Sequence, residues 1–75
     1  MMVTWCRVTT VGPDGVAVAS GLLEGPVAPD MSVVDDLARM ALMAKRLGGS
    51  ILLTEVCADL RALLELAGLG LEIEG

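Results

Sequence analysis

The chain has 75 residues, of which 55% are apolar, and a formal net charge of −5. This length allows one domain, residues 1–75. The acidic charge argues against binding to nucleic acid or to anionic lipid, because both present negative phosphates. Trp5 is the only aromatic residue, so the chain also lacks the aromatic platforms on which single-stranded nucleic acid stacks.

Cysteine content and hydropathy indicate the compartment. Cys6 and Cys57 are far apart in the sequence and too few for a disulfide scaffold, which favours a reducing environment. Every long apolar run is interrupted by a charge or a glycine, so we expect no membrane-spanning segment. These features predict a cytoplasmic protein with free thiols.

The first third of the chain is typical of a β-hairpin. Residues 3–10 are rich in Val and Thr and alternate loosely, which predicts a half-buried strand. The Gly-Pro-Asp-Gly sequence at residues 12–15 predicts a turn, and residues 16–20 alternate again as a second strand. The glycines and prolines of residues 21–30 predict a loop.

Residues 33–47 have the apolar spacing of a helix. Ser32 is expected to cap its start, with Asp35 completing a capping box. Asp35 and Asp36 are then placed where the helix dipole favours negative charge. Met43 lies off the main apolar stripe, which favours burial of the helix on two sides or an interface.

The remaining elements complete an α/β pattern. Residues 51–53 form a short apolar run that predicts a strand buried on both faces. Residues 59–67 predict a second helix, and the alternation of residues 69–74 predicts a last strand. The order β-β-α-β-α-β therefore predicts a small mixed sheet of about four strands covered by two helices, in which a β-α-β portion supplies a parallel pair.

Two segments, RLGGSILLTEV at residues 46–56 and LRALLELAGL at residues 60–69, resemble the C-terminal half of STAS domains, the family of sulfate transporters and anti-sigma-factor antagonists. The resemblance implies a STAS-like fold and a protein-binding module whose partner is an anti-sigma-factor-like regulatory protein. Members of the family are switched by phosphorylation of a Ser in Asp-Ser-Ser-Gly-Leu-Gly.

That motif corresponds here to residues 30–35, Asp-Met-Ser-Val-Val-Asp. Asp30 and Ser32 match, but Met31 stands at the phosphoacceptor position and both glycines are absent, so the usual switch is expected to be missing. The chain is also shorter than STAS domains by one helix and one strand. A shortened member would leave a sheet edge or a helix face uncovered, which favours a homodimer or a permanent partner.

The sequence predicts a partner-binding surface on the loop and the first helix, acidic and aliphatic in character. Its expected residues are Asp30, Met31, Ser32, Val33, Asp36 and Met43. Ser32 is also a candidate phosphorylation site, although helix capping is the preferred interpretation because aspartates crowd the same position.

Catalytic and metal-binding roles find little support in the sequence. Asp35 and Asp36 diverge around a helix and the chain has no His, so no metal site or cofactor is expected. Cys57 precedes the second helix, where a thiol can be activated, but it has no His as a base, so no catalytic residue is assigned. Two alternatives remain: a structural homo-oligomer with an apolar self-interface, and, less favoured, a thiol enzyme that uses Cys57.

Overall fold

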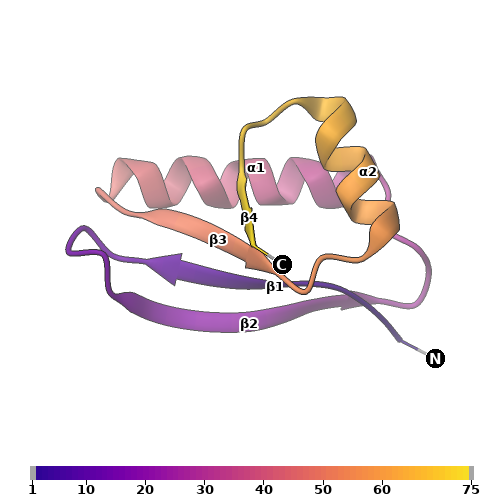
Figure 1. The fold of residues 1–75 in the computed structure, drawn as a ribbon, viewed down its shortest axis with the longest axis horizontal. Coiled ribbons are helices and arrows are strands. Elements are labelled where there is room, and N and C mark those ends of the chain that lie inside the picture. The colour runs from indigo at the N-terminus through magenta and orange to yellow at the C-terminus, as the bar shows by residue number, and fades with distance from the viewer. Residues whose placement is uncertain (1, 75) are drawn as a thin grey trace.

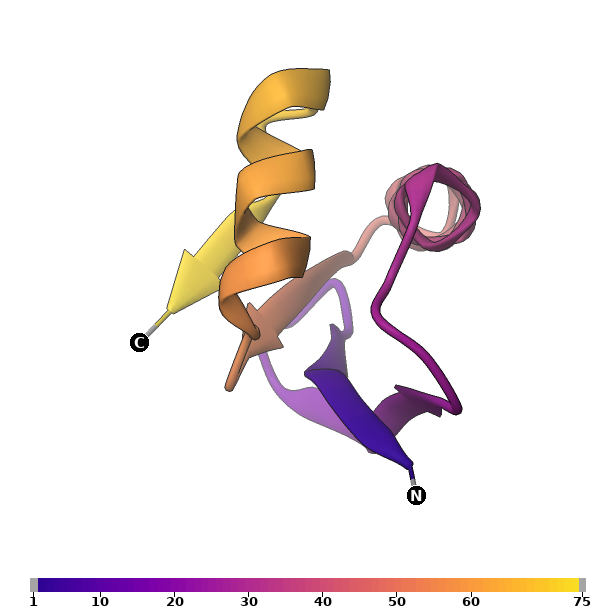
Figure 2. The same cartoon turned by 90° about the vertical axis from the view of Figure 1, so that its right-hand side faces the viewer.

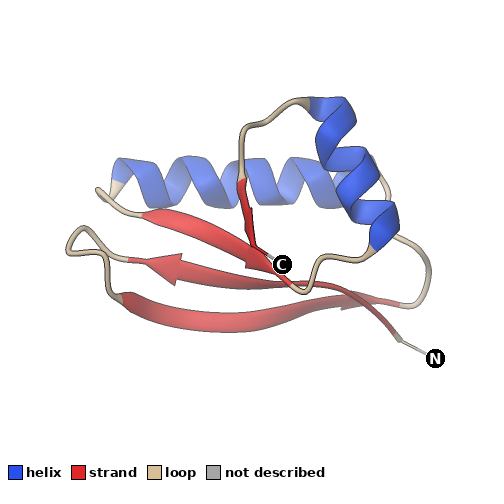
Figure 3. Ribbon diagram, in the orientation of Figure 1, coloured by secondary structure: helices blue, strands red, loops and turns tan. Residues whose placement is uncertain are grey.

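The computed structural model describes residues 2–74, which form four strands and two helices in the predicted order (Figure 1; Figure 3). The elements are β1 Val3–Val11, β2 Ala17–Gly25, α1 Met31–Arg46, β3 Ser50–Thr54, α2 Ala58–Ala67 and β4 Glu72–Glu74. The predicted α/β class with a four-stranded mixed sheet is confirmed. Within these residues, neither helix combines the length and the apolar character that crossing a membrane requires.

The strands lie in the order β2-β1-β3-β4. β1 is antiparallel to both of its neighbours, and β3 is parallel to β4. β2 and β3 therefore run in the same direction with β1 between them, so α1 links two parallel strands that do not touch. Both helices lie on one side of the sheet (Figure 2). The other face of the sheet has no covering layer among the described residues.

The core fills the space between the sheet and the helices. Its buried side chains are Cys6, Val8, Val33, Val34, Leu37, Ala44, Ile51, Leu53, Leu60 and Leu64. Ile51 and Leu53 are buried on the helix side of β3, whereas Leu52, between them, is only half-buried. The prediction that this strand is buried on both faces was therefore wrong, because the helices cover only one face.

Trp5 joins the hairpin to the first helix. A β-bulge falls between Thr4 and Cys6, and the Trp5 side chain packs against the core. Its ring lies so close to Gly25 that a Cβ at that position would overlap it. Its Nε1 donates a hydrogen bond of 3.0 Å to the carbonyl oxygen of Val27. The loop between β2 and α1 is thereby attached to β1.

Two predicted boundaries were wrong. Residues 21–25, expected in a loop, continue β2, because their backbone pairs with β1 from Val3 to Val8. Conversely, β4 is limited to residues 72–74, since Gly70 has a left-handed backbone with φ of 66° that interrupts the predicted strand. The length of β2 therefore depends on backbone pairing with β1, and the start of β4 depends on the local conformation of Gly70.

Candidate functional site

The start of α1 is capped by Asp30 and not by Ser32. Asp30 Oδ1 accepts hydrogen bonds from the Ser32 backbone N–H at 2.9 Å and from the Ser32 hydroxyl at 2.5 Å. The hydroxyl bond, followed by the backbone bond, lowers the pKa of the Asp30 carboxyl below its usual value of 3.8. The predicted capping box does not form. Asp35 instead pairs with Arg39, one turn along the helix, at 3.3 Å.

The six residues predicted to bind a partner do not form one surface. Val33 is buried in the core and cannot contact a partner. Ser32, Asp36 and Met43 lie on one flank of α1, because their spacing of four and seven residues repeats along one face of a helix. Met31 lies on the other flank, where it faces the C-terminal end of α2. The way α1 is oriented on the sheet therefore places the predicted residues on two different flanks of the helix.

On the Met31 flank, two hollows adjoin one another along α1. The first, of about 360 Å³, lies between α1 and the end of α2 and is lined by Met31, Val34, Asp35, Ala38, Ala67 and Leu69. The second, of about 390 Å³, continues it toward the end of α1 and includes Ala41, Lys45, Leu69 and Glu72. Because Leu69 lines both, we treat them as one feature, the interhelical groove. From Met31 to Lys45 it extends about 21 Å along the helix.

Four large apolar side chains are exposed along the interhelical groove. Met31 and Leu69 line it directly. Leu42 lies one turn beyond Ala38 on the same flank of α1, and Leu66 is exposed on α2 next in sequence to the lining residue Ala67, but neither lines the hollows themselves. Leu66 and Leu69 were not among the residues predicted from the sequence, although Leu66 lies off the apolar stripe of its helix and could have been noticed for that reason.

The amount of exposed surface indicates an uncovered contact area. The accessible surface of the molecule is 4800 Å². A monomer of 7.7 kDa is expected to expose about 4300 Å². Twelve large apolar side chains are exposed, of which Met31 and Leu69 line the interhelical groove and Leu42 lies on the same flank of α1. Such clustering is typical of protein contact sites.

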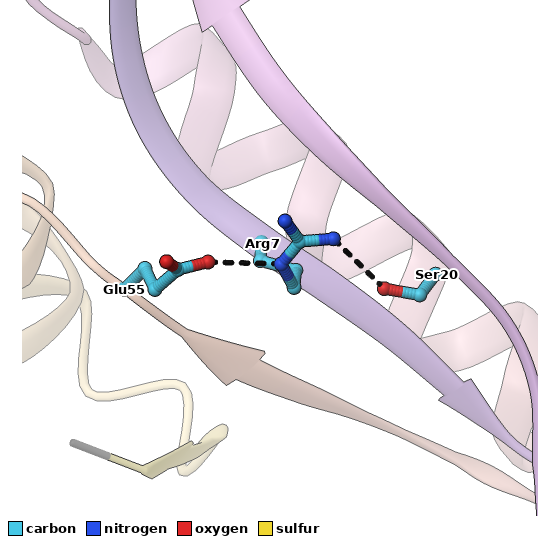
Figure 4. Close-up of polar contacts among 3 residues, drawn as sticks. All are labelled: Arg7, Ser20 and Glu55. Carbon is cyan, nitrogen blue, oxygen red and sulfur yellow. Dashed lines mark hydrogen bonds and ion pairs between the residues drawn. The ribbon is translucent and has the colours of Figure 1, made fainter.

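The open face of the sheet has a different, polar character. Arg7 lies there, and its Nε donates to Glu55 Oε2 at 2.8 Å while Nη1 donates to Ser20 Oγ at 3.4 Å (Figure 4). Glu55 has a left-handed backbone with φ of 52°. These exposed contacts attach the loop after β3 to the hairpin, and each stabilises the fold by at most about 1 kcal/mol. We assign them a structural role.

The two cysteines show no arrangement for catalysis. Cys6 is fully buried, and the backbone N–H of Cys57 donates to the Trp5 carbonyl oxygen at 2.9 Å. Burial, with a smaller effect of the neighbouring Cys57, raises the pKa of the Cys6 thiol to about 11. A thiol that stays protonated is a poor nucleophile. Among the residues described, no group of three His, Cys, Asp or Glu side chains is placed to hold a metal ion.

The raised pKa of Cys6 predicts a loss of stability in alkali. As the pH rises, the unfolded chain loses this proton near pH 9.0, while the folded chain keeps it until about pH 11. The free energy of unfolding should therefore be unaffected by this thiol below pH 9 and fall by up to about 1.4 kcal/mol per pH unit between the two pKa values. Urea unfolding followed by Trp5 fluorescence measures the slope. Cys57→Ser should keep the slope and Cys6→Ala should lose it, so equal slopes in these two variants would contradict the assignment.

Comparisons with protein-family models, with curated proteins and with solved structures found no match. The resemblance to STAS domains therefore stays a prediction. The interhelical groove, with its exposed apolar rim, is the candidate functional site on the evidence of its own geometry.

Proposed function

We propose that this protein is a protein-interaction module for a regulatory protein, as the resemblance to anti-sigma-factor antagonists implies, and that it binds a helix of that partner in the interhelical groove. The observation that carries the proposal is the row of exposed apolar side chains on the rim of a groove about 21 Å long. A partner helix of about 14 residues matches that length, and an amphipathic helix can place its apolar face in such a groove.

The charge around the groove favours a basic partner. Asp35 and Glu72 line the groove, and Asp30 is exposed beside Met31 at one end. Lys45 is the one basic residue among those that line either hollow. With a net charge of −5 on the whole chain, an approaching helix with Lys or Arg beside its apolar face would be attracted and an acidic one repelled.

The proposal does not include a phosphorylation switch at Ser32. Its hydroxyl already donates to the Asp30 carboxylate. A phosphate there would remove that donor and place about two negative charges next to the carboxylate. Repulsion from Asp30 would offset the attraction of the helix N-terminus for an anion. Constitutive binding is the simpler mode of action.

Two further parts of the proposal concern location and chemistry. A cytoplasmic location is supported by the two cysteines, both of which are free. Catalysis is not part of the proposed function, because the chain contains no His to activate Cys57 and the Cys6 thiol is buried. The proposed role is recognition alone.

Binding of model helices tests the proposal. We expect an amphipathic peptide of alternating leucine and lysine blocks to bind more tightly than its leucine and glutamate counterpart, because the groove is apolar and acidic. Titration followed by amide chemical shifts should give the largest changes around Met31, Ala38 and Leu69. Replacing Leu69, which lines both hollows, with Glu should weaken binding of the lysine peptide at least tenfold, since it removes an apolar contact and adds a charge in the groove.

A matched variant separates this effect from a general change of charge. Val16→Glu adds the same charge in the hairpin, away from the groove, and should leave peptide affinity within about twofold, because screening at physiological salt limits charge effects to about 8 Å. Preference for the glutamate peptide, or shift changes confined to the open face of the sheet, would refute the proposed groove. If the groove is confirmed, a photo-crosslinking residue at position 66 can be used to identify the natural partner in a cell extract.

A further inference from the structure

The outer edge of β2 is a second uncovered surface. β2 lies at one end of the sheet and pairs only with β1. It contains no Lys, Arg or Pro, and its single charged residue is Glu24. Proteins usually protect an edge strand with such residues, because its unpaired backbone groups otherwise recruit another strand. A bulge at Val18 leaves Ala19 to Gly25 as a regular segment of unprotected edge.

The helix layer also stops short of β2. Ala19 and Gly21 share a face of the sheet with the buried Val8 and Leu53, through the register of β2 with β1 and of β1 with β3. Both are nevertheless exposed. The sheet thus extends one strand beyond the cover of α1, as Figure 2 also shows.

Apolar side chains are exposed on both sides of this edge. Leu22 pairs with Arg7 and lies on the open face, whereas Met43 and Leu47 lie on the helix side, and Val3, Val16 and Val18 are exposed on the hairpin. Leu47 and Val18 line a common, almost wholly apolar hollow of about 200 Å³ between the hairpin and the end of α1. Met43 lies one turn before Leu47 on the same flank of the helix. The surface that combines the β2 edge with these side chains is called the β2 surface below.

We propose that the β2 surface binds a second copy of this chain, with the two β2 strands antiparallel about a two-fold axis at Leu22, so that the two sheets join into one. The distribution of charge along β2 is compatible with a second copy as the binding partner. In that register Leu22 faces its own copy, Gly21 faces Leu23 and Ser20 faces Glu24, so like charges do not meet. Glu24 is the only charged residue of the paired segment and faces the neutral Ser20, so charge repulsion along the strands does not oppose this contact.

The area of the β2 contact limits the affinity of the dimer. The seven residues 19–25 that pair in this register span about 24 Å, and the shortest dimension of the molecule is 20 Å. A contact of those dimensions covers about 480 Å² on each copy, or about 1000 Å² in total, which is the size of weak, transient interfaces. The dimer should therefore dissociate in the micromolar range and form reversibly with concentration. This inference does not depend on the proposed function.

Sedimentation at increasing concentration tests the dimer. Wild-type protein should convert from monomer to dimer as its concentration rises through the micromolar range. Leu22→Lys should raise the dissociation constant at least tenfold, because two lysines would face each other at the axis. Leu22 is exposed, so the variant should keep the circular dichroism spectrum and unfolding midpoint of the wild-type monomer. Leu66→Lys introduces the same charge on α2 and should dimerise normally.

Cross-linking provides a second readout that does not rely on equilibrium. Residues facing each other across antiparallel strands have Cα atoms about 4.5–5.5 Å apart, within the range of a disulfide. In a Cys57→Ser background, Leu22→Cys should oxidise to a covalent dimer, and Leu66→Cys should not. A monomer at all concentrations up to millimolar, or a dimer abolished by Leu66→Lys and not by Leu22→Lys, would overturn the inference. Peptide binding in the groove should persist in Leu22→Lys, so the two proposals fail separately.

Discussion

Leu53→Ala is expected to remove about 3–5 kcal/mol from the free energy of unfolding, more than any other truncation of β3. Leu53 is fully buried at the centre of the sheet, opposite Val8 of β1 and Ile73 of β4. Strands on both sides and helices above hold the surrounding atoms in place, so the vacated volume cannot close completely. A chain of 75 residues has a total stability of only about 4–11 kcal/mol. The variant should thus be marginally folded at 25 °C.

Thermal unfolding measures this effect. A loss of 3 kcal/mol lowers the melting temperature of a domain of this size by about 12–24 °C. Leu66→Ala removes the same atoms from a side chain that is 83% exposed, and its stability should stay within about 0.5 kcal/mol of wild type. If Leu53→Ala costs less than about 1 kcal/mol, β3 does not occupy the centre of the core and the sheet order must be different.

Gly49→Ala is expected to lower the free energy of unfolding by about 3 kcal/mol. A Cβ on residue 49 would overlap the carbonyl oxygen of Val11 and lie 3.2 Å from its carbonyl carbon. These are backbone atoms at the end of β1, where Val11 pairs with Ser50 of β3. Relief of the overlap requires β1 and β3 to move apart, which disrupts the ladder that holds the hairpin to the rest of the sheet.

The neighbouring Gly48 provides the matched comparison. Its φ is 84°, so an alanine there is strained, but the nearest atoms to its Cβ are those of the Pro13 side chain at 3.5 Å. Gly48→Ala should therefore cost about 1–2 kcal/mol, from backbone conformation alone. Denaturant unfolding of both variants separates steric overlap from conformational strain. A Gly49→Ala variant as stable as Gly48→Ala would show that β1 and β3 are farther apart at this point than the Val11 contact implies.

The two proposed surfaces give α1 a double role. One flank, with Met31, faces α2 and the interhelical groove, and the other, with Met43 and Leu47, belongs to the β2 surface. The breadth of the apolar pattern in this helix predicted burial on two sides or an interface. In the structure the buried stripe lies between two exposed apolar flanks. Dimerisation through one flank would leave the groove on the other open in each copy.

Only part of the candidate site could be predicted. Asp30 and Met31 were predicted from the resemblance of residues 30–35 to the STAS motif, and both are exposed, with Met31 lining the groove. Val33 was included wrongly, because a position next to a helix start does not reveal which way the side chain points. Leu66 and Leu69 were missed because they come near the groove only through the packing of α2 and the following loop on α1.

Elements with local causes could be predicted from the amino-acid pattern. The Gly-Pro-Asp-Gly turn closes with a bond from the Gly15 N–H to the Gly12 carbonyl, and Gly68 ends α2 in a left-handed conformation, both through contacts between near neighbours. Three features became visible only in the folded chain: β1 lies between β2 and β3, residues 21–25 form a strand, and both helices cover the same face. Those outcomes depend on backbone pairing and apolar contact between segments far apart in the chain, which a local pattern does not encode.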